Sequence, residues 1–123
     1  MARLWMACGG VIGLLAVAMA GYAAHGLPQA MEAKAVQDLR AGVQMQGWHA
    51  LALIGVALWA PRGGWLADLA GTAFVLGVLL FCGAVYALAL SGARVGAVAP
   101  IGGTLLMTGW LLLAASAVFA RAG

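Results

Sequence analysis

Four long apolar stretches follow one another along the chain, separated by segments that hold most of its charged and turn-forming residues. They predict helices at about residues 4–24, 42–60, 66–90 and 97–120, and a helix needs roughly 20 residues to cross a bilayer. The apolar residues occupy all helix faces, whereas a membrane β-strand alternates polar and apolar positions. Because backbone polar groups inside a bilayer must pair within the chain, the pattern predicts four transmembrane helices.

Two of the three connections between these stretches are short and contain turn-forming residues, at 61–64 and 91–94. Short connections place consecutive helices antiparallel to each other. We therefore predict an all-α membrane protein with a single domain, residues 1–123, folded as an up-down-up-down four-helix bundle. Both termini then lie on one side of the membrane, the terminal side, and the first and third connections lie on the other, the loop side.

The first connection is longer and predicts an amphipathic helical segment at about residues 28–41. Pro28 suits the first turn of a helix. Met31, Ala35 and Leu39 follow at intervals of four and so form an apolar stripe. The segment is either a helix on the membrane surface or the projecting start of the second transmembrane helix.

The composition agrees with a membrane protein. Hydrophobic residues make up 66% of the chain and charged residues 7%, whereas a soluble domain carries about 25% charged residues. The formal net charge is +3, but the basic residues are scattered singly, mostly beside apolar stretches, as membrane anchors are. This distribution argues against nucleic-acid binding.

The basic residues are divided equally between the two predicted sides of the membrane, so the positive-inside rule does not orient the chain. The terminal side carries Arg3, Arg62 and Arg121, and the loop side carries Lys34, Arg40 and Arg94. Glu32 and Asp38 reduce the net charge of the loop side, and on that ground we predict termini in the cytoplasm.

Polar residues of the predicted helices concentrate at the loop side. Gln46 and His49 lie in the first turns of the second helix and share one face, because they are three residues apart. Polar side chains inside a membrane are costly and therefore mark candidate sites. The candidate ligand-binding site comprises His25, Gln46, His49 and Tyr86, with Pro100, Gly102 and Gly103 at the start of the fourth helix.

Three interpretations of this cluster stay open. Its side chains bond to one another and close the bundle, or they form a pocket for a small amphiphile or lipid headgroup, or His25 and His49 ligate a metal ion or haem. Two histidines without a nearby carboxylate or thiol make a poor metal site, so we predict no metal ligand. For the function we favour binding of a membrane lipid or another amphiphile.

Catalysis is not expected. The chain offers no set of nucleophile, base and acid, and Glu32, Asp38 and Asp68 fall at or outside the predicted helix ends. No glycine-rich phosphate loop follows a strand. We therefore predict a non-enzymatic protein.

Small residues four positions apart allow helix backbones to approach closely. Gly9 with Gly13, and Ala73 with Gly77, have this spacing. They either pack inside one bundle or contact a second copy or a larger membrane complex. In the latter case the protein is an accessory or structural subunit, which is our alternative function.

Four sequence strings carry a family resemblance. They are AGYAAHGL at residues 20–27, QGWHALAL at 46–53, FCGAVYALAL at 81–90, and PIGG at 100–103 followed by Gly109-Trp110. In this order and spacing the chain resembles the bacterial inner-membrane family of unknown function 423, which is related to transmembrane protein 256. The resemblance implies a four-helix protein of the inner membrane and implies no activity, and any cofactor is unknown at this point.

Overall fold

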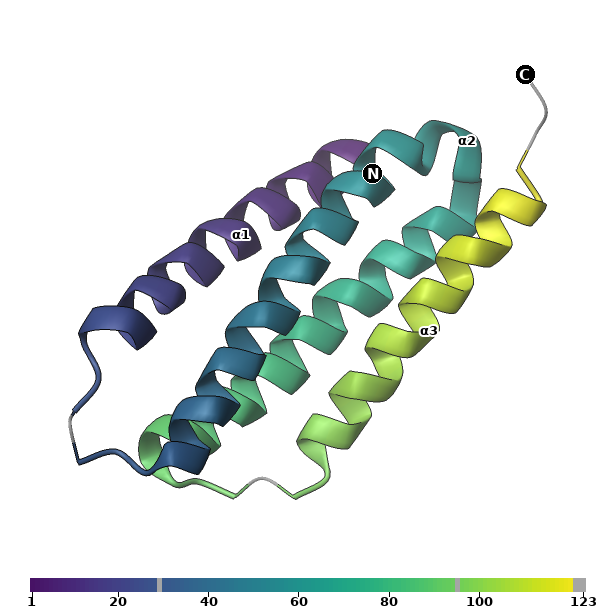
Figure 1. Ribbon diagram of the computed structural model, residues 1–123. Coiled ribbons are helices and arrows are strands. Elements are labelled where there is room, and N and C mark those ends of the chain that lie inside the picture. The colour runs from purple at the N-terminus through teal and green to yellow at the C-terminus, as the bar shows by residue number, and fades with distance from the viewer. Residues whose placement is uncertain (29, 95, 121–123) are drawn as a thin grey trace.

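The computed structural model of the protein describes residues 1–28, 30–94 and 96–120. In these ranges it contains three α-helices, which are α1 (Ala2–His25), α2 (Ala33–Ser91) and α3 (Val98–Val118) (Figure 1). All three are long and apolar enough to cross a membrane. Gln29 of the predicted amphipathic segment and Arg121 of the predicted terminal side fall outside the described ranges.

The prediction of four separate helices is wrong, because the second and third predicted helices belong to one element. α2 includes both of them, and Pro61 lies inside it. Only Gly64 leaves the helical conformation, with φ 62° and ψ −146°, a region that residues with a side chain rarely occupy. The chain reverses at this residue, so a kink replaces the predicted turn.

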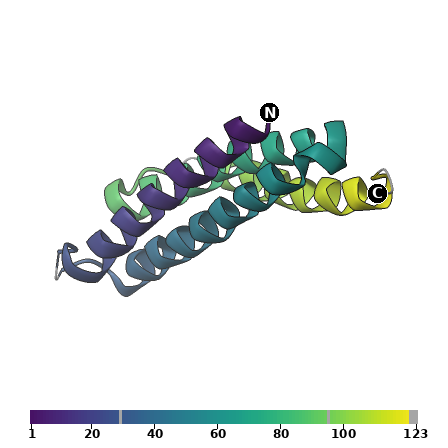
Figure 2. The ribbon, with the colours of Figure 1, turned by 90° about the horizontal axis from the view of Figure 1, so that it is seen from above.

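We call residues 33–63 the first arm of α2 and residues 65–91 its second arm. The two arms lie side by side in both views (Figure 1, Figure 2). Cys82 on the second arm donates a weak S–H hydrogen bond to the carbonyl oxygen of Gly42 on the first, at 3.5 Å. The start of α1, the kink and the end of α3 lie at one end of the molecule, and both connections lie at the other (Figure 1).

The predicted amphipathic segment is mostly the start of α2. The helix begins at Ala33 and continues without a break into the apolar part of the first arm. Leu39 is completely buried, and it packs with Ala23 of α1 and Ala89 of the second arm. Residues 33–41 therefore form the first turns of α2 and not a separate helix.

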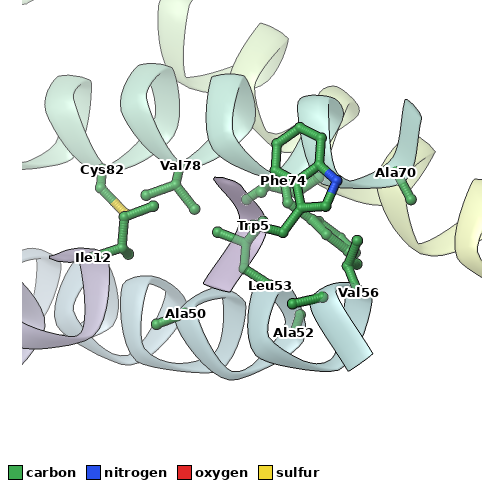
Figure 3. Packing of buried hydrophobic residues seen from close by; sticks show 12 residues of the cluster. Trp5, Ile12, Ala50, Ala52, Leu53, Val56, Ala70, Phe74, Val78 and Cys82 are labelled. Atoms are coloured by element: carbon green, nitrogen blue, oxygen red, sulfur yellow. The ribbon is translucent and has the colours of Figure 1, made fainter. Parts of the chain in front are cut away.

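α2 organises the core. It packs against both α1 and α3, whereas α1 and α3 do not contact each other within the described residues. Figure 3 shows Trp5 of α1 among Leu53, Val56 and Phe74 of the two arms. Leu106 of α3 joins the same cluster. Three of these side chains, those of Leu53, Val56 and Phe74, have no exposed surface.

Two of the small residues singled out in the sequence lie at close contacts within the chain. A side chain at Gly9 would meet the carbonyl oxygen of Ala50 at 2.9 Å, and one at Gly77 would meet the carbonyl oxygen of Gly102 at 3.0 Å. Without side chains at these positions the helix backbones approach closely.

The outward surface of all three helices is apolar. Leu14, Val17, Leu58, Leu111 and Val118 are each between 68% and 77% exposed. A soluble protein rarely leaves so many large apolar side chains in water, whereas acyl chains cover such a surface at no cost.

Adjacent glycines on α1 provide a matched test of this packing. We expect Gly9→Ala to lower the free energy of unfolding by about 1–3 kcal/mol through overpacking against Ala50. Gly10→Ala should leave it unchanged or raise it slightly, because no atom lies within 4 Å of that position. The measurement is equilibrium unfolding in detergent followed by circular dichroism. Equal effects of the two substitutions would show that this contact is absent.

Candidate functional site

Gln46 links three parts of the fold. Its side-chain Nε2 donates a hydrogen bond to the carbonyl oxygen of Ile12 on α1, at 3.0 Å. Its Oε1 accepts one from the hydroxyl of Tyr86 on the second arm, at 2.7 Å. Gln46 itself is 6% exposed. Its two hydrogen bonds within the protein replace the bonds to water that the amide loses on burial. The amide therefore ties α1 to both arms of α2.

His49 lies one helical turn further along the first arm and is 2% exposed. Its Nδ1 is 2.6 Å from the carbonyl oxygen of Met45, which can only accept, so Nδ1 carries the proton. Its Nε2 accepts a hydrogen bond from the indole N–H of Trp110 on α3, at 3.0 Å. This pair of bonds requires the neutral ring and uses both of its nitrogen atoms.

Aromatic rings enclose this histidine. The ring centroid of His49 is 5.5 Å from that of Phe74 and 5.7 Å from that of Trp110. Phe74 and Trp110 meet edge to face, with centroids 5.0 Å apart, a favoured geometry for aromatic pairs. The cluster joins the first arm, the second arm and α3, as Gln46 joins α1 to the two arms.

The other predicted site residues lie apart from these bonds. His25 is exposed at the end of α1 and Pro100 is exposed in the first turn of α3. Gly102 is buried, and a side chain there would collide with the backbone of Phe81. A side chain at Gly103 would be in ordinary contact with the Phe81 ring, at 3.8 Å. The two glycines therefore serve the packing of α3 against the second arm.

Sequence reasoning missed the tryptophans as hydrogen-bond donors. Besides Trp110, Trp5 donates to the Asp68 carboxylate at 2.9 Å and Trp59 donates to the Ser116 hydroxyl at 2.8 Å. Each bond connects residues at least 57 positions apart in the sequence. For Asp68 a usable signal existed, because a carboxylate at the end of a predicted apolar helix needs a hydrogen-bond donor.

The described part of the chain leaves no buried side-chain nitrogen or oxygen without a hydrogen-bond partner. Nor does it gather three or more histidine, cysteine or acidic side chains where a metal ion could bind. We call Gln46, His49, Tyr86 and Trp110 the polar cluster, and the polar side-chain atoms of these residues bond within the protein.

An open hollow of about 560 Å³ lies at the loop side, between the start of the first arm, the end of the second arm and the connection to α3. Its charged residues are Glu32, Lys34, Asp38 and Arg94. Lys34 and Asp38 form an ion pair at 3.2 Å. The volume of the hollow falls in the range typical of small-molecule sites.

The apolar part of the hollow comes mainly from the second arm, from Ala84, Val85, Leu88 and Ala89. None of the seven residues predicted as the site lines it. The polar cluster and the hollow thus lie in different positions, and of the seven predicted residues only Gln46, His49 and Tyr86 belong to the polar cluster.

Trp110→Phe tests the polar cluster, because it removes one N–H and keeps an aromatic ring beside His49. We expect the free energy of unfolding to fall by about 1–2 kcal/mol, the range for a hydrogen bond between membrane helices and its orphaned partner. Trp48→Phe is the control, since Trp48 is 55% exposed and should change stability little. The contradictory result is equal stability of the two variants in detergent unfolding followed by circular dichroism.

A family model and several individual proteins that are similar to this chain all indicate one family. The model of the family described as "Protein of unknown function (DUF423)" matches residues 19–103. The "UPF0382 membrane protein" of Haemophilus influenzae is 42% identical over 103 residues, 83% of each chain. The "UPF0382 inner membrane protein YgdD" of Escherichia coli K12 is 32% identical over 118 residues, which cover 94% of this chain and 90% of that protein.

Bacillus subtilis also has a similar protein. The "UPF0382 membrane protein YwdK" of Bacillus subtilis is 31% identical over 119 residues, 94% of this chain and 97% of that protein. No solved structure matches the chain. The predicted family and the predicted location are confirmed: with its three apolar helices, this chain is an integral protein of the bacterial inner membrane and belongs to the DUF423 family of uncharacterised membrane proteins.

Proposed function

We propose that the chain crosses the bilayer four times, with α1, the first arm of α2, the second arm and α3 as separate crossings. A straight helix of the 59 residues of α2 would extend roughly 90 Å, about three times the thickness of the hydrocarbon core. The reversal at Gly64 gives each arm a length suited to one crossing. Both connections then lie on one side of the membrane, and we propose that this side faces away from the cytoplasm.

Cysteine labelling tests the four crossings. We expect Arg62→Cys and Arg94→Cys to react with a membrane-impermeant maleimide from opposite sides, in a chain that also carries Cys8→Ala and Cys82→Ala. In intact spheroplasts Arg94→Cys should react, and Arg62→Cys should react only after lysis. Labelling of both positions from one side would contradict the proposal.

We further propose a non-enzymatic function, the binding of an amphiphile by its headgroup in the hollow at the loop side. The observation that carries this proposal is the combination of four charged residues and an apolar floor in one open space of about 560 Å³. Charged groups suit a headgroup at the membrane surface, and the apolar floor suits the chain attached to it.

The polar cluster has a different role in this proposal. Gln46 and His49 are bonded on both polar ends of their side chains, so a ligand there would have to break bonds within the protein. The hollow offers charged groups at no such cost. The polar cluster therefore holds the helices that form the walls of the hollow.

A bulky residue in the hollow tests the binding function. Ala35 lines the hollow, and we expect Ala35→Trp to fill it and to abolish retention of a bound amphiphile. Ala41→Trp is the control, because Ala41 is exposed on the same arm and outside the hollow. The readout is native mass spectrometry of protein extracted gently from its own membranes, with circular dichroism to confirm folding. Retention of the same added mass by both variants would refute the proposal.

A role as an accessory subunit is the second candidate. Gly10 and Gly21 on the outer surface of α1 are exposed and have no neighbouring atom within 4 Å, so another helix can approach them closely. That helix belongs to a second copy or to a larger membrane complex. Crosslinking in membranes from Gly10→Cys should then give one dominant product, and a spread of products without a major partner would count against this role.

A further inference from the structure

We infer that the hollow selects a lipid whose headgroup carries both a phosphate and a primary ammonium group, that is, a phosphoethanolamine lipid. This inference names the ligand class of the binding function proposed above and rests on it. Three features of the hollow support it, namely its charge balance, its lack of aromatic side chains and its apolar floor.

The charges around the hollow are balanced, with two acidic and two basic side chains. Lys34 and Asp38 are paired with each other. Glu32 and Arg94 form no ion pair with any residue that the structure describes, which leaves one anion and one cation at the same space. A guanidinium binds phosphate oxygens well, and a carboxylate accepts hydrogen bonds from an ammonium group. A net anionic headgroup would use only Arg94 and would be repelled by Glu32.

The residue types that line the hollow indicate the kind of ammonium group. None of the described residues that line the hollow is aromatic. Quaternary ammonium groups lack N–H donors and are recognised by aromatic rings through cation–π interactions. A primary ammonium donates hydrogen bonds, which Glu32 can accept. The hollow thus favours an ethanolamine headgroup over a choline headgroup.

The floor of the hollow indicates a lipid rather than a free headgroup. Val85, Leu88 and the alanines beside them present apolar surface next to the charged groups. Leu88 is 40% exposed, so an acyl chain that leaves the hollow can continue along the apolar surface of the second arm. A soluble headgroup would leave this surface uncovered and gain nothing from it.

The test uses the full chain, delipidated in detergent, and native mass spectrometry of bound lipid. Phosphoethanolamine, phosphocholine and phosphoglycerol lipids with identical acyl chains are titrated in parallel, together with soluble glycerophosphoethanolamine. We expect the ethanolamine lipid to bind about tenfold more tightly than either other lipid, as one charge-assisted hydrogen bond allows. The soluble headgroup should bind far more weakly than the lipid.

Charge variants assign the selectivity to residues. Glu32→Gln should remove the preference for the ethanolamine lipid over the choline lipid. Arg94→Gln should weaken the binding of all three lipids. Arg62→Gln is the control, because Arg62 is an exposed arginine beside the kink at the other end of the molecule, and it should bind like the unmodified chain.

The outcomes separate the two proposals. Equal binding of the three lipids, all lost in Ala35→Trp, overturns the headgroup assignment and supports the binding function. Binding of all lipids that survives Ala35→Trp overturns both. Soluble glycerophosphoethanolamine that binds as tightly as the lipid overturns the assignment to a membrane lipid.

Discussion

Inside a bilayer no water is available to a buried amide, and the position of Gln46 shows how the fold meets this constraint. Its two polar atoms reach a backbone carbonyl of α1 and the Tyr86 hydroxyl of the second arm. An apolar bundle of helices has little hydrophobic preference for one arrangement in lipid, because acyl chains are as apolar as the side chains. Directional bonds and close backbone contacts must therefore specify which helix faces meet.

The same principle applies along the length of the molecule. Tryptophan indoles donate to Asp68 and Ser116 in the half that contains the kink, and to His49 nearer the loop side. One of these bonds joins the second arm of α2 to α1, and the other two join its first arm to α3. At other contacts glycines allow the helix backbones to approach closely, as at Gly9 and Gly102, where a side chain would collide with a neighbouring backbone. With the internal bonds satisfied, the open hollow brings accessible charged groups of both signs together beside an apolar surface.

Much of the fold could be predicted from the sequence, and the failures have physical causes. Hydropathy located the apolar segments well, because a bilayer demands about 20 apolar residues per crossing. It did not show that one residue, Gly64, suffices to reverse the chain, since the motif at residues 61–64 looks the same for a loop and for a kinked helix. The sequence also did not decide whether residues 28–41 form a separate helix, and in the structure Leu39 is buried with residues of α1 and the second arm, within a helix that continues from Ala33.

The candidate site was predicted only in part. Depth along the helices grouped Gln46 with Tyr86, which do bond to each other. It did not reveal Trp110 as the partner of His49, because in an all-apolar helix the sequence does not show which face an aromatic residue occupies. The hollow was missed for a related reason. Glu32 and Arg94 are 62 positions apart in the sequence, and only the reversal of α2 brings their segments to one space.

In the proposed division of roles, the polar cluster holds the helices together and the hollow binds the lipid. Nuclear magnetic resonance of the isotopically labelled protein in nanodiscs tests it directly, with a phosphoethanolamine lipid added to a phosphocholine bilayer. The account predicts that the side-chain N–H signal of Arg94 shifts with added lipid, while the side-chain amide signals of Gln46 and the indole signal of Trp110 stay in place. Shifts at Gln46 and Trp110 with none at Arg94 would place the ligand in the polar cluster and contradict the account.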